Sequence, residues 1–260
     1  MPHHGQANYF TINLYQQKVG SLLWVAVNTR PDVAFAVSRL GRHSHNPSHQ
    51  HHEAADRVIL YLKIHRTLGL QFGASEGQDD LVIASDASFA DNTIDRKSSQ
   101  AYAIRLFGGL IMWSATKQNT VTTSTTEAEL LALTQAAKEG YFMSRLLHAL
   151  TIRIDDPRIR LQCDNQQTIR LVTAEVILLK TKLRHVDIHQ HWLRQECAKG
   201  TLQVEYVPSN KIIADSLTKA LQGTNFEAFK TQLGLVDIAD RLRQRREREL
   251  QDEDLEDTEF

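Results

Sequence analysis

The spacing of hydrophobic positions divides the chain into zones of different texture. From Tyr15 to Phe72 apolar residues recur every three to four positions, which predicts helices separated at Pro31 and by the polar stretch HSHNPSHQHH. The segment GASEGQDD over residues 73–80 is rich in glycine and acid, so we expect a linker there. The pattern therefore predicts a helical segment over residues 1–80 that is distinct from the part that follows.

Beyond residue 80, short apolar runs alternate with longer amphipathic ones. Strands are predicted over residues 81–88, 100–107, 109–116, 159–164 and 202–208. Helices are predicted over residues 125–150, 166–179, 187–200 and 210–221. This order indicates an α/β domain over residues 81–238, with a five-stranded mixed sheet and helices packed on it. A charged, partly helical tail is expected over residues 239–260.

Composition and charge exclude several classes of protein. The longest apolar runs, Leu22–Val27 and Val176–Leu179, are too short to cross a bilayer, so we expect no membrane partner. Two cysteines exclude a disulfide framework and a four-cysteine zinc site, and they fit a reducing compartment. Seven of the 31 acidic residues follow Arg248, so residues 1–248 carry 30 basic and 24 acidic residues, a net charge of +6. This basic body is compatible with a polyanionic partner or with an ordinary solvated surface.

Acidic residues occur where the surrounding pattern is apolar. Asp86 follows LVIAS in the first predicted strand, and Asp164 closes LQC in the fourth, so each bears a desolvation cost. Taken singly, each is explained as a cap or the start of a turn, but two on different strands weaken that explanation. Asp215 lies between Ala214 and Leu217, where the alternative is a first-turn acid favoured by the helix dipole.

The period of the long predicted helix distinguishes its two glutamates. From Glu129 the positions three, four, seven and eight residues onward are alanines and a leucine, an apolar stripe that should face the sheet. Glu127 leads toward polar positions, so we expect it on the solvated side, where it stabilises the helix N-terminus through the dipole. Glu129 is therefore predicted to lie against the strands near Asp86.

Four carboxylates with few histidine or cysteine neighbours are typical of a hard-cation site for Mg²⁺ or Mn²⁺ rather than zinc. Such sites commonly hold two ions about 4 Å apart and act on phosphodiesters. The predicted metal ligands, which are also the predicted catalytic residues, are Asp86, Glu129, Asp164 and Asp215.

Several ordered motifs between Tyr15 and Ile238 carry a family resemblance. They read VGSLLWVAVNTRPDVAFAVSRL, SDASFADNTIDRKSS, GGLIMWSATKQNTV, STTEAELLALTQAAKE, QCDNQQTI, RHVDIHQHWLRQE and YVPSNKIIADSLTKAL. With these motifs the chain resembles the ribonuclease H domain of Ty1/copia-type LTR retrotransposon Pol polyproteins, together with the segment that connects it to reverse transcriptase.

The resemblance implies a ribonuclease H-like fold preceded by a helical connecting segment, and cleavage of the RNA strand of an RNA/DNA hybrid with two Mg²⁺ ions, or Mn²⁺. In the implied reaction water attacks the phosphorus in line and a 3′-hydroxyl leaves. The motifs SDAS, AELLAL, CDN and ADSLTK imply the same four carboxylates. The implied partners are the hybrid and a reverse transcriptase domain.

The chain also departs from the family pattern. Phe89 stands where the family usually has tryptophan, KSSQAY replaces KSTSGY, and the basic run LKTKLRH lacks its first histidine. The loop PSNK before Asp215 contains no histidine that could assist product release. A folded but catalytically decayed relic that binds nucleic acid or a reverse transcriptase partner is therefore the alternative to an active enzyme.

Other residues have a functional and an ordinary interpretation. Phosphate contacts are predicted, against plain surface charges, for Arg96, Lys97, Lys117, Lys182 and Arg184. The histidines between His43 and His52 do not match a metal-binding spacing, so a solvated loop is expected. Trp113 and Cys163 are expected in the core. The arginines after Ile238 are expected to pair with the acids that follow them.

Overall fold

A computed structural model describes residues 6–73, 81–174 and 184–256, except for the side chains of residues 184–186 and 250–256. Its N-terminal part consists of helices α1 (Tyr9–Asn28), η1 (Pro31–Val33), α2 (Ala34–Gly41) and α3 (His49–Ile64), followed by the short strand β1 (Leu68–Leu70). Asn8 caps α1 by accepting from the backbone N–H of Thr11, and Pro31 opens η1, where proline is favoured. The predicted helical segment is confirmed.

The strands of the central sheet are β2 (Leu81–Ser88), β3 (Ser99–Leu106), β4 (Gly109–Lys117), β5 (Ile159–Cys163) and β6 (Leu202–Tyr206). Their order is β4-β3-β2-β5-β6, with antiparallel pairing from β4 to β2 and parallel pairing from β2 to β6. Within the described residues this is the five-stranded mixed sheet that the sequence predicts, in the ribonuclease H-like arrangement. All five predicted strands are confirmed to within one or two residues.

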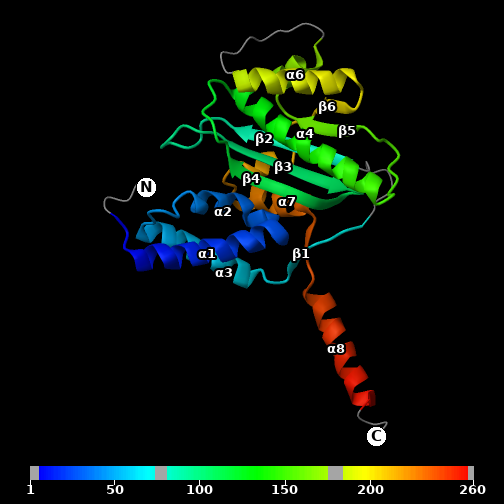
Figure 1. Ribbon diagram of the computed structural model, residues 1–260. Coiled ribbons are helices and arrows are strands. Elements are labelled where there is room, and N and C mark those ends of the chain that lie inside the picture. Colours follow the sequence, from blue (N-terminus) through cyan, green and yellow to red (C-terminus); the bar gives the residue numbers. More distant parts are fainter. Residues whose placement is uncertain (1–5, 74–80, 175–183, 257–260) are drawn as a thin grey trace.

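Helices cover both faces of the sheet (Figure 1). One face carries α4 (Thr125–Ala149), α5 (Gln166–Thr173) and α6 (Arg184–Ala198), and its core includes Ile83, Leu133 and Leu193. Gly140 allows α4 to approach the sheet, because a Cβ atom there would lie 2.7 Å from Ile159 Cγ2. Volume added at this position would therefore strain the packing of α4 on the sheet.

The opposite face packs against α1, α2 and α7 (Gly223–Leu233), as Figure 1 shows. Trp113 of β4 is buried, and its indole N–H donates to the Ala26 carbonyl of α1 at 2.7 Å. Arg39 of α2 pairs with Asp91 at 2.6 Å. These contacts attach the N-terminal helices to the sheet. The boundaries at residues 80 and 238 stay a prediction.

The C-terminal residues return to the N-terminal segment before the tail begins. Strand β7 (Leu235–Asp237) pairs antiparallel with β1, and α8 (Ala239–Glu256) then projects away from the body (Figure 1). Arg245 and Glu249 pair at 2.7 Å within α8, as the sequence predicts for this tail. Helix α7 and the β1–β7 pair were not predicted from the sequence.

The predicted helix over residues 210–221 is wrong. Only the short 3₁₀ helix η2 (Asp215–Leu217) forms there, within a segment of turns. The backbone N–H groups of Leu217 and Thr218 donate to carbonyls three residues back rather than four, which is the pattern of a 3₁₀ helix and of turns. Of the helix predicted over residues 166–179, residues 166–173 form α5, and residues 175–179 lie outside the described residues.

The expectation of a solvated histidine loop is also wrong in part. Residues 49–52 open α3, and His51 is buried. Its Nδ1 accepts from the backbone N–H of Ser48 at 2.9 Å, which completes a capping box, and its ring stacks on His43 with centroids 3.8 Å apart. These histidines therefore organise the start of a helix.

Candidate active site

Parallel pairing brings two of the acidic residues to one edge of the sheet. Ala84 of β2 is aligned with Gln162 of β5, so Asp86 and Asp164, each two residues further on, reach the same level. Asp215 opens η2 at this edge. One carboxylate oxygen from each of Asp86, Asp164 and Asp215 lies within 4.8 Å of the others. Three segments far apart in the sequence thus supply one acidic group.

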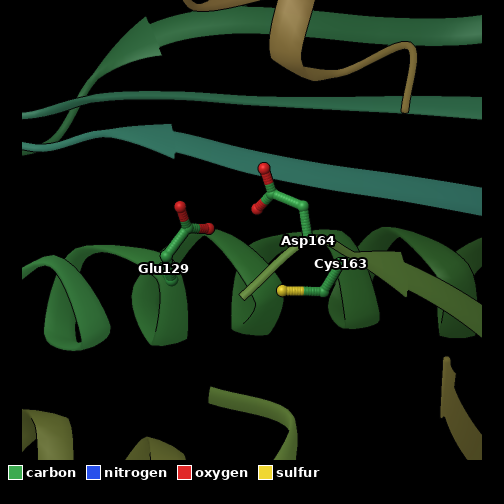
Figure 2. A group of neighbouring side chains, drawn as sticks. All are labelled: Glu129, Cys163 and Asp164. Carbon is green, nitrogen blue, oxygen red and sulfur yellow. The ribbon is translucent and has the colours of Figure 1, made fainter. Parts of the chain in front are cut away.

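Helix α4 supplies the fourth carboxylate. Glu129 is 4% exposed and points toward the same region as Asp164, as Figure 2 shows. A carboxylate oxygen of Glu129 lies within 4.8 Å of an Asp164 oxygen and of Cys163 Sγ. Small buried residues, Ala87 on the strand and Ala128 and Ala132 on the helix, let the two elements approach closely here. The structure therefore places Glu129 against the strands, as the apolar stripe predicts.

Burial and mutual repulsion perturb the ionisation of two of these acids. Desolvation raises the pKa of Asp86 to about 6, with further increases from the charges of Asp215 and Asp164 and an opposing effect from the Thr218 hydrogen bond. Desolvation also raises the pKa of Glu129 to about 9, and the charges of Asp86 and Asp164 add to the increase. The negative charges of these carboxylates are thus not fully compensated by positive charges nearby, as expected where a cation binds.

Three neighbours that were not singled out from the sequence contact these acids. Ser209 Oγ donates to Asp164 Oδ2 at 2.6 Å, and Thr218 Oγ1 donates to Asp86 Oδ2. Lys219 Nζ pairs with Asp215 Oδ1. The available signal was the position of Thr218 and Lys219, three and four residues after an acid that was already a candidate.

Lys219 is held by these carboxylates. Burial alone would lower the pKa of Lys219, but its hydrogen bond to Asp215 and the charges of Asp215, Asp86 and Asp164 raise it above its ordinary value. The lysine therefore carries a positive charge beside the acidic group.

The donor set fits a hard divalent cation. All four carboxylates offer oxygen ligands, and Glu129 Oε2 is buried without a hydrogen-bond partner among the described residues. Cys163 is a poor ligand, because desolvation raises the pKa of its thiol well above the ordinary range, and its Sγ accepts from the backbone N–H of Asn165 at 3.4 Å. The chemistry of the donors therefore favours Mg²⁺ or Mn²⁺ over zinc.

The predicted solvated position of Glu127 is wrong. Glu127 is only 6% exposed, because the segment before α4 folds over the first helical turn. The backbone N–H and the hydroxyl of Thr123 both donate to Glu127 Oε2 at 2.7 Å, while Ser124 caps the helix by accepting from the Glu127 backbone N–H. Glu127 is thus a buried acid that stabilises the start of α4 by accepting these hydrogen bonds.

The predicted phosphate-contacting residues fall into two groups. Arg96 and Lys97 lie in the loop after β2, and Lys117 at the end of β4 pairs with Asp95 of that loop at 2.8 Å. These three therefore belong to one surface, at the sheet edge that carries Asp86. Lys182 lies outside the described residues, and Arg184 opens α6 with a side chain that is not described. Their phosphate contacts stay a prediction.

Comparison with known sequences identifies the family of this chain. The retrovirus-related Pol polyprotein from transposon TNT 1-94 of Nicotiana tabacum is 35% identical over 222 residues, which are 85% of this chain and 16% of that protein. The chain belongs to the Pol polyproteins of Ty1/copia-type transposons. It spans less than a fifth of the length of these Pol polyproteins. No family model matches it.

Two further similarities concern parts of this Pol-related chain. Secreted RxLR effector protein 161 of Plasmopara viticola is 38% identical over 130 residues, 50% of this chain and 91% of that protein. The crystal structure of LC11-RNase H1 in complex with RNA/DNA hybrid covers 53% of the Pol-related chain and 92% of its own, with 16% identity and a TM-score of 0.39. The fold assignment rests on the strand order rather than on this superposition. No helix among the described residues has the length and apolar character to cross a membrane.

Proposed function

We propose that the chain is an endoribonuclease that cleaves the RNA strand of RNA/DNA hybrids with two divalent metal ions. The observation that carries this proposal is the convergence of Asp86, Glu129, Asp164 and Asp215 on one edge of a ribonuclease H-like sheet. The Pol polyprotein family and the ordered motifs support the choice of reaction. The four carboxylates are proposed as metal ligands and catalytic residues.

Each side chain has a proposed task at the site. Asp86 and Asp164 lie side by side on neighbouring parallel strands, so both can bind the same cation. Glu129 adds an oxygen from α4, through a buried atom that has no hydrogen-bond partner in the described part of the chain. Bound Mg²⁺ would activate water and stabilise the leaving oxygen of the phosphodiester. Thr218 and Ser209 orient the carboxylates of Asp86 and Asp164 by donating to one oxygen of each.

The hybrid is proposed as the substrate because both of its strands offer phosphates and its RNA strand alone offers 2′-hydroxyls. The loop with Arg96 and Lys97, together with Lys117, lies at the sheet edge that carries the acids, where it can contact the phosphate backbone. Selection of the RNA strand would come from contacts to 2′-hydroxyls across the minor groove. A reverse transcriptase domain as a second partner stays a prediction from the resemblance.

The test is cleavage of an RNA/DNA hybrid by the purified chain and its variants. Asp164→Asn keeps the size of the side chain but removes a negative charge from the site, so cleavage in Mg²⁺ should fall by about a hundredfold or more. Asp156→Asn is the matched control, because Asp156 is on the surface and pairs with Arg158 at 2.7 Å. It should cleave like the wild-type chain.

Two results would contradict the proposal. Full activity of Asp164→Asn would show that the carboxylate group is not the active site. Hybrid binding by the wild-type chain without cleavage in either Mg²⁺ or Mn²⁺ would instead favour the decayed relic. Binding is measured separately by fluorescence anisotropy, with and without EDTA.

A further inference from the structure

The lysine beside the acidic group occupies an unusual position. Lys219 Nζ contacts Asp215 Oδ1, and the charges of Asp86 and Asp164 also act on this ammonium group. Oxygens of these three aspartates lie within 4.8 Å of one another. A single positive charge from the chain itself therefore lies among the oxygens that are proposed to bind metal.

The other contacts of the acids are neutral. Asp86 accepts from the hydroxyl of Thr218, and Asp164 accepts from the hydroxyl of Ser209. Among the salt bridges of the described residues, the one that reaches these carboxylates comes from Lys219. The lysine thus supplies the compensating charge that the acidic group needs in the absence of a divalent ion.

The segment that carries Lys219 is anchored while the ammonium group is free to leave. Leu217 and Thr218 are buried, and the Thr218 hydroxyl bonds both to Asp86 and to the Asp215 carbonyl. The Lys219 side chain is 49% exposed, so its flexible stem can turn toward solvent without disturbing this anchor. The backbone position is fixed, and the charge can move.

We infer that Lys219 is an internal cation that stabilises the metal-free acidic group and competes with a divalent ion for the oxygens of Asp215. This inference rests on the proposed metal-dependent function. Divalent metal, with twice the charge, would displace the ammonium group from the carboxylate. Because the two cations compete for one ligand, removing the lysine charge should make metal bind more tightly, and binding of metal should weaken the lysine ion pair by the same factor.

The experiment compares Mg²⁺ binding by isothermal titration calorimetry in four full-length chains. Lys219→Met removes the charge and keeps an unbranched side chain of nearly the same length, and Lys219→Arg keeps the charge. Lys199→Met is the matched control, because Lys199 is 51% exposed and pairs with Glu196 at 2.8 Å away from the acidic group. Thermal unfolding with EDTA and with Mg²⁺ checks that each variant folds.

The dissociation constant for Mg²⁺ should fall roughly tenfold in Lys219→Met and stay near the wild-type value in Lys219→Arg and Lys199→Met. In EDTA, Lys219→Met should melt at a lower temperature than the wild-type chain, and Mg²⁺ should remove this difference. Unchanged or weaker Mg²⁺ binding by a folded Lys219→Met chain would overturn the inference.

These outcomes are separable from the proposed function. If Lys219→Met fails to tighten binding while the wild-type chain binds Mg²⁺ and cleaves the hybrid, only the role of the lysine is refuted. If neither chain binds Mg²⁺, the inference and the metal-dependent function are refuted together.

Discussion

Two glutamates that lie two residues apart on α4 should respond in opposite ways to the same substitution. Glu129 is buried beside other acids, and desolvation followed by the charges of Asp86 and Asp164 raises its pKa to about 9. Glu127 is also buried, but it accepts two hydrogen bonds from Thr123. In the metal-free chain we expect Glu129→Gln to stabilise the fold and Glu127→Gln to destabilise it.

The magnitudes follow from the ionisation and the hydrogen bonds. Glu129 has a pKa near 4.5 when unfolded, so keeping it protonated in the fold at pH 7 costs about 3 kcal/mol, at 1.36 kcal/mol per pH unit. Glutamine is neutral in both states, so Glu129→Gln should raise the free energy of unfolding by up to about 3 kcal/mol. Glu127→Gln exchanges a charged acceptor for a neutral one and should lower it by about 1–2 kcal/mol.

The pH dependence gives the prediction its sign. Because the pKa of Glu129 is raised in the fold, its contribution to stability is largest below about pH 4.5 and is lost as the pH rises toward 9. The metal-free wild-type chain should therefore become less stable across this range, and Glu129→Gln should show a shallower decline. Mg²⁺ should stabilise the wild-type chain more than Glu129→Gln, because the variant offers one charged ligand fewer.

The assay is urea unfolding followed by circular dichroism with excess EDTA, at several pH values between about 5 and 9. Glu127→Gln serves as the internal control for loss of a buried carboxylate on the same helix. Destabilisation of Glu129→Gln by as much as Glu127→Gln, or parallel pH profiles for wild type and Glu129→Gln, would refute the reasoning.

Three further predictions concern acid stability, packing and metal removal. Burial, followed by the charges of His51 and neighbouring arginines, lowers the pKa of His43 to about 4, so His43 contributes a loss of stability as the pH falls from 6.5 toward 4, opposite in sign to the contribution of Glu129. His43→Gln should show less of this loss in urea unfolding, whereas an unchanged difference between the two pH values would contradict it; exposed His45→Gln is the control. Gly140→Ala should destabilise by about 1–3 kcal/mol, and Gly20→Ala, where a Cβ meets open space, should stabilise by up to about 1 kcal/mol; equal melting temperatures would contradict this. EDTA should abolish hybrid cleavage and added Mg²⁺ should restore it, so cleavage that persists in EDTA would contradict a metal-dependent site.

The regular elements could be predicted because each has a local period. The strand LVIASDAS coincides with β2, and the alanine and leucine stripe of α4 assigns Glu129 to the face against the sheet. The buried side of α4 is set by the spacing along the helix, whereas β2 is a continuous run that is buried on both faces. The parallel pairing of β2 with β5 brings Asp86 and Asp164 together, while the catalytic roles of the four acids stay a prediction.

The remaining features depend on contacts between distant segments. The apolar residues between 210 and 221 predict a helix, but the backbone hydrogen bonds around η2 span three residues, as in turns and a 3₁₀ helix, and the apolar pattern does not distinguish the two. Glu127 is buried by an irregular segment whose path no pattern specifies. Ser209 and Lys219 contact acids only through the tertiary fold. The sequence pattern alone does not distinguish a charged residue on the surface from one that contacts the site.

Strand-selective cleavage of an RNA/DNA hybrid tests the central proposal most directly. The two strands carry different fluorescent labels, and the products are separated on a denaturing gel after incubation with Mg²⁺. The wild-type chain should shorten only the RNA strand, and Asp86→Asn should leave both strands intact. Cleavage of the DNA strand, or equal cleavage by wild type and Asp86→Asn, would contradict the proposed ribonuclease H activity.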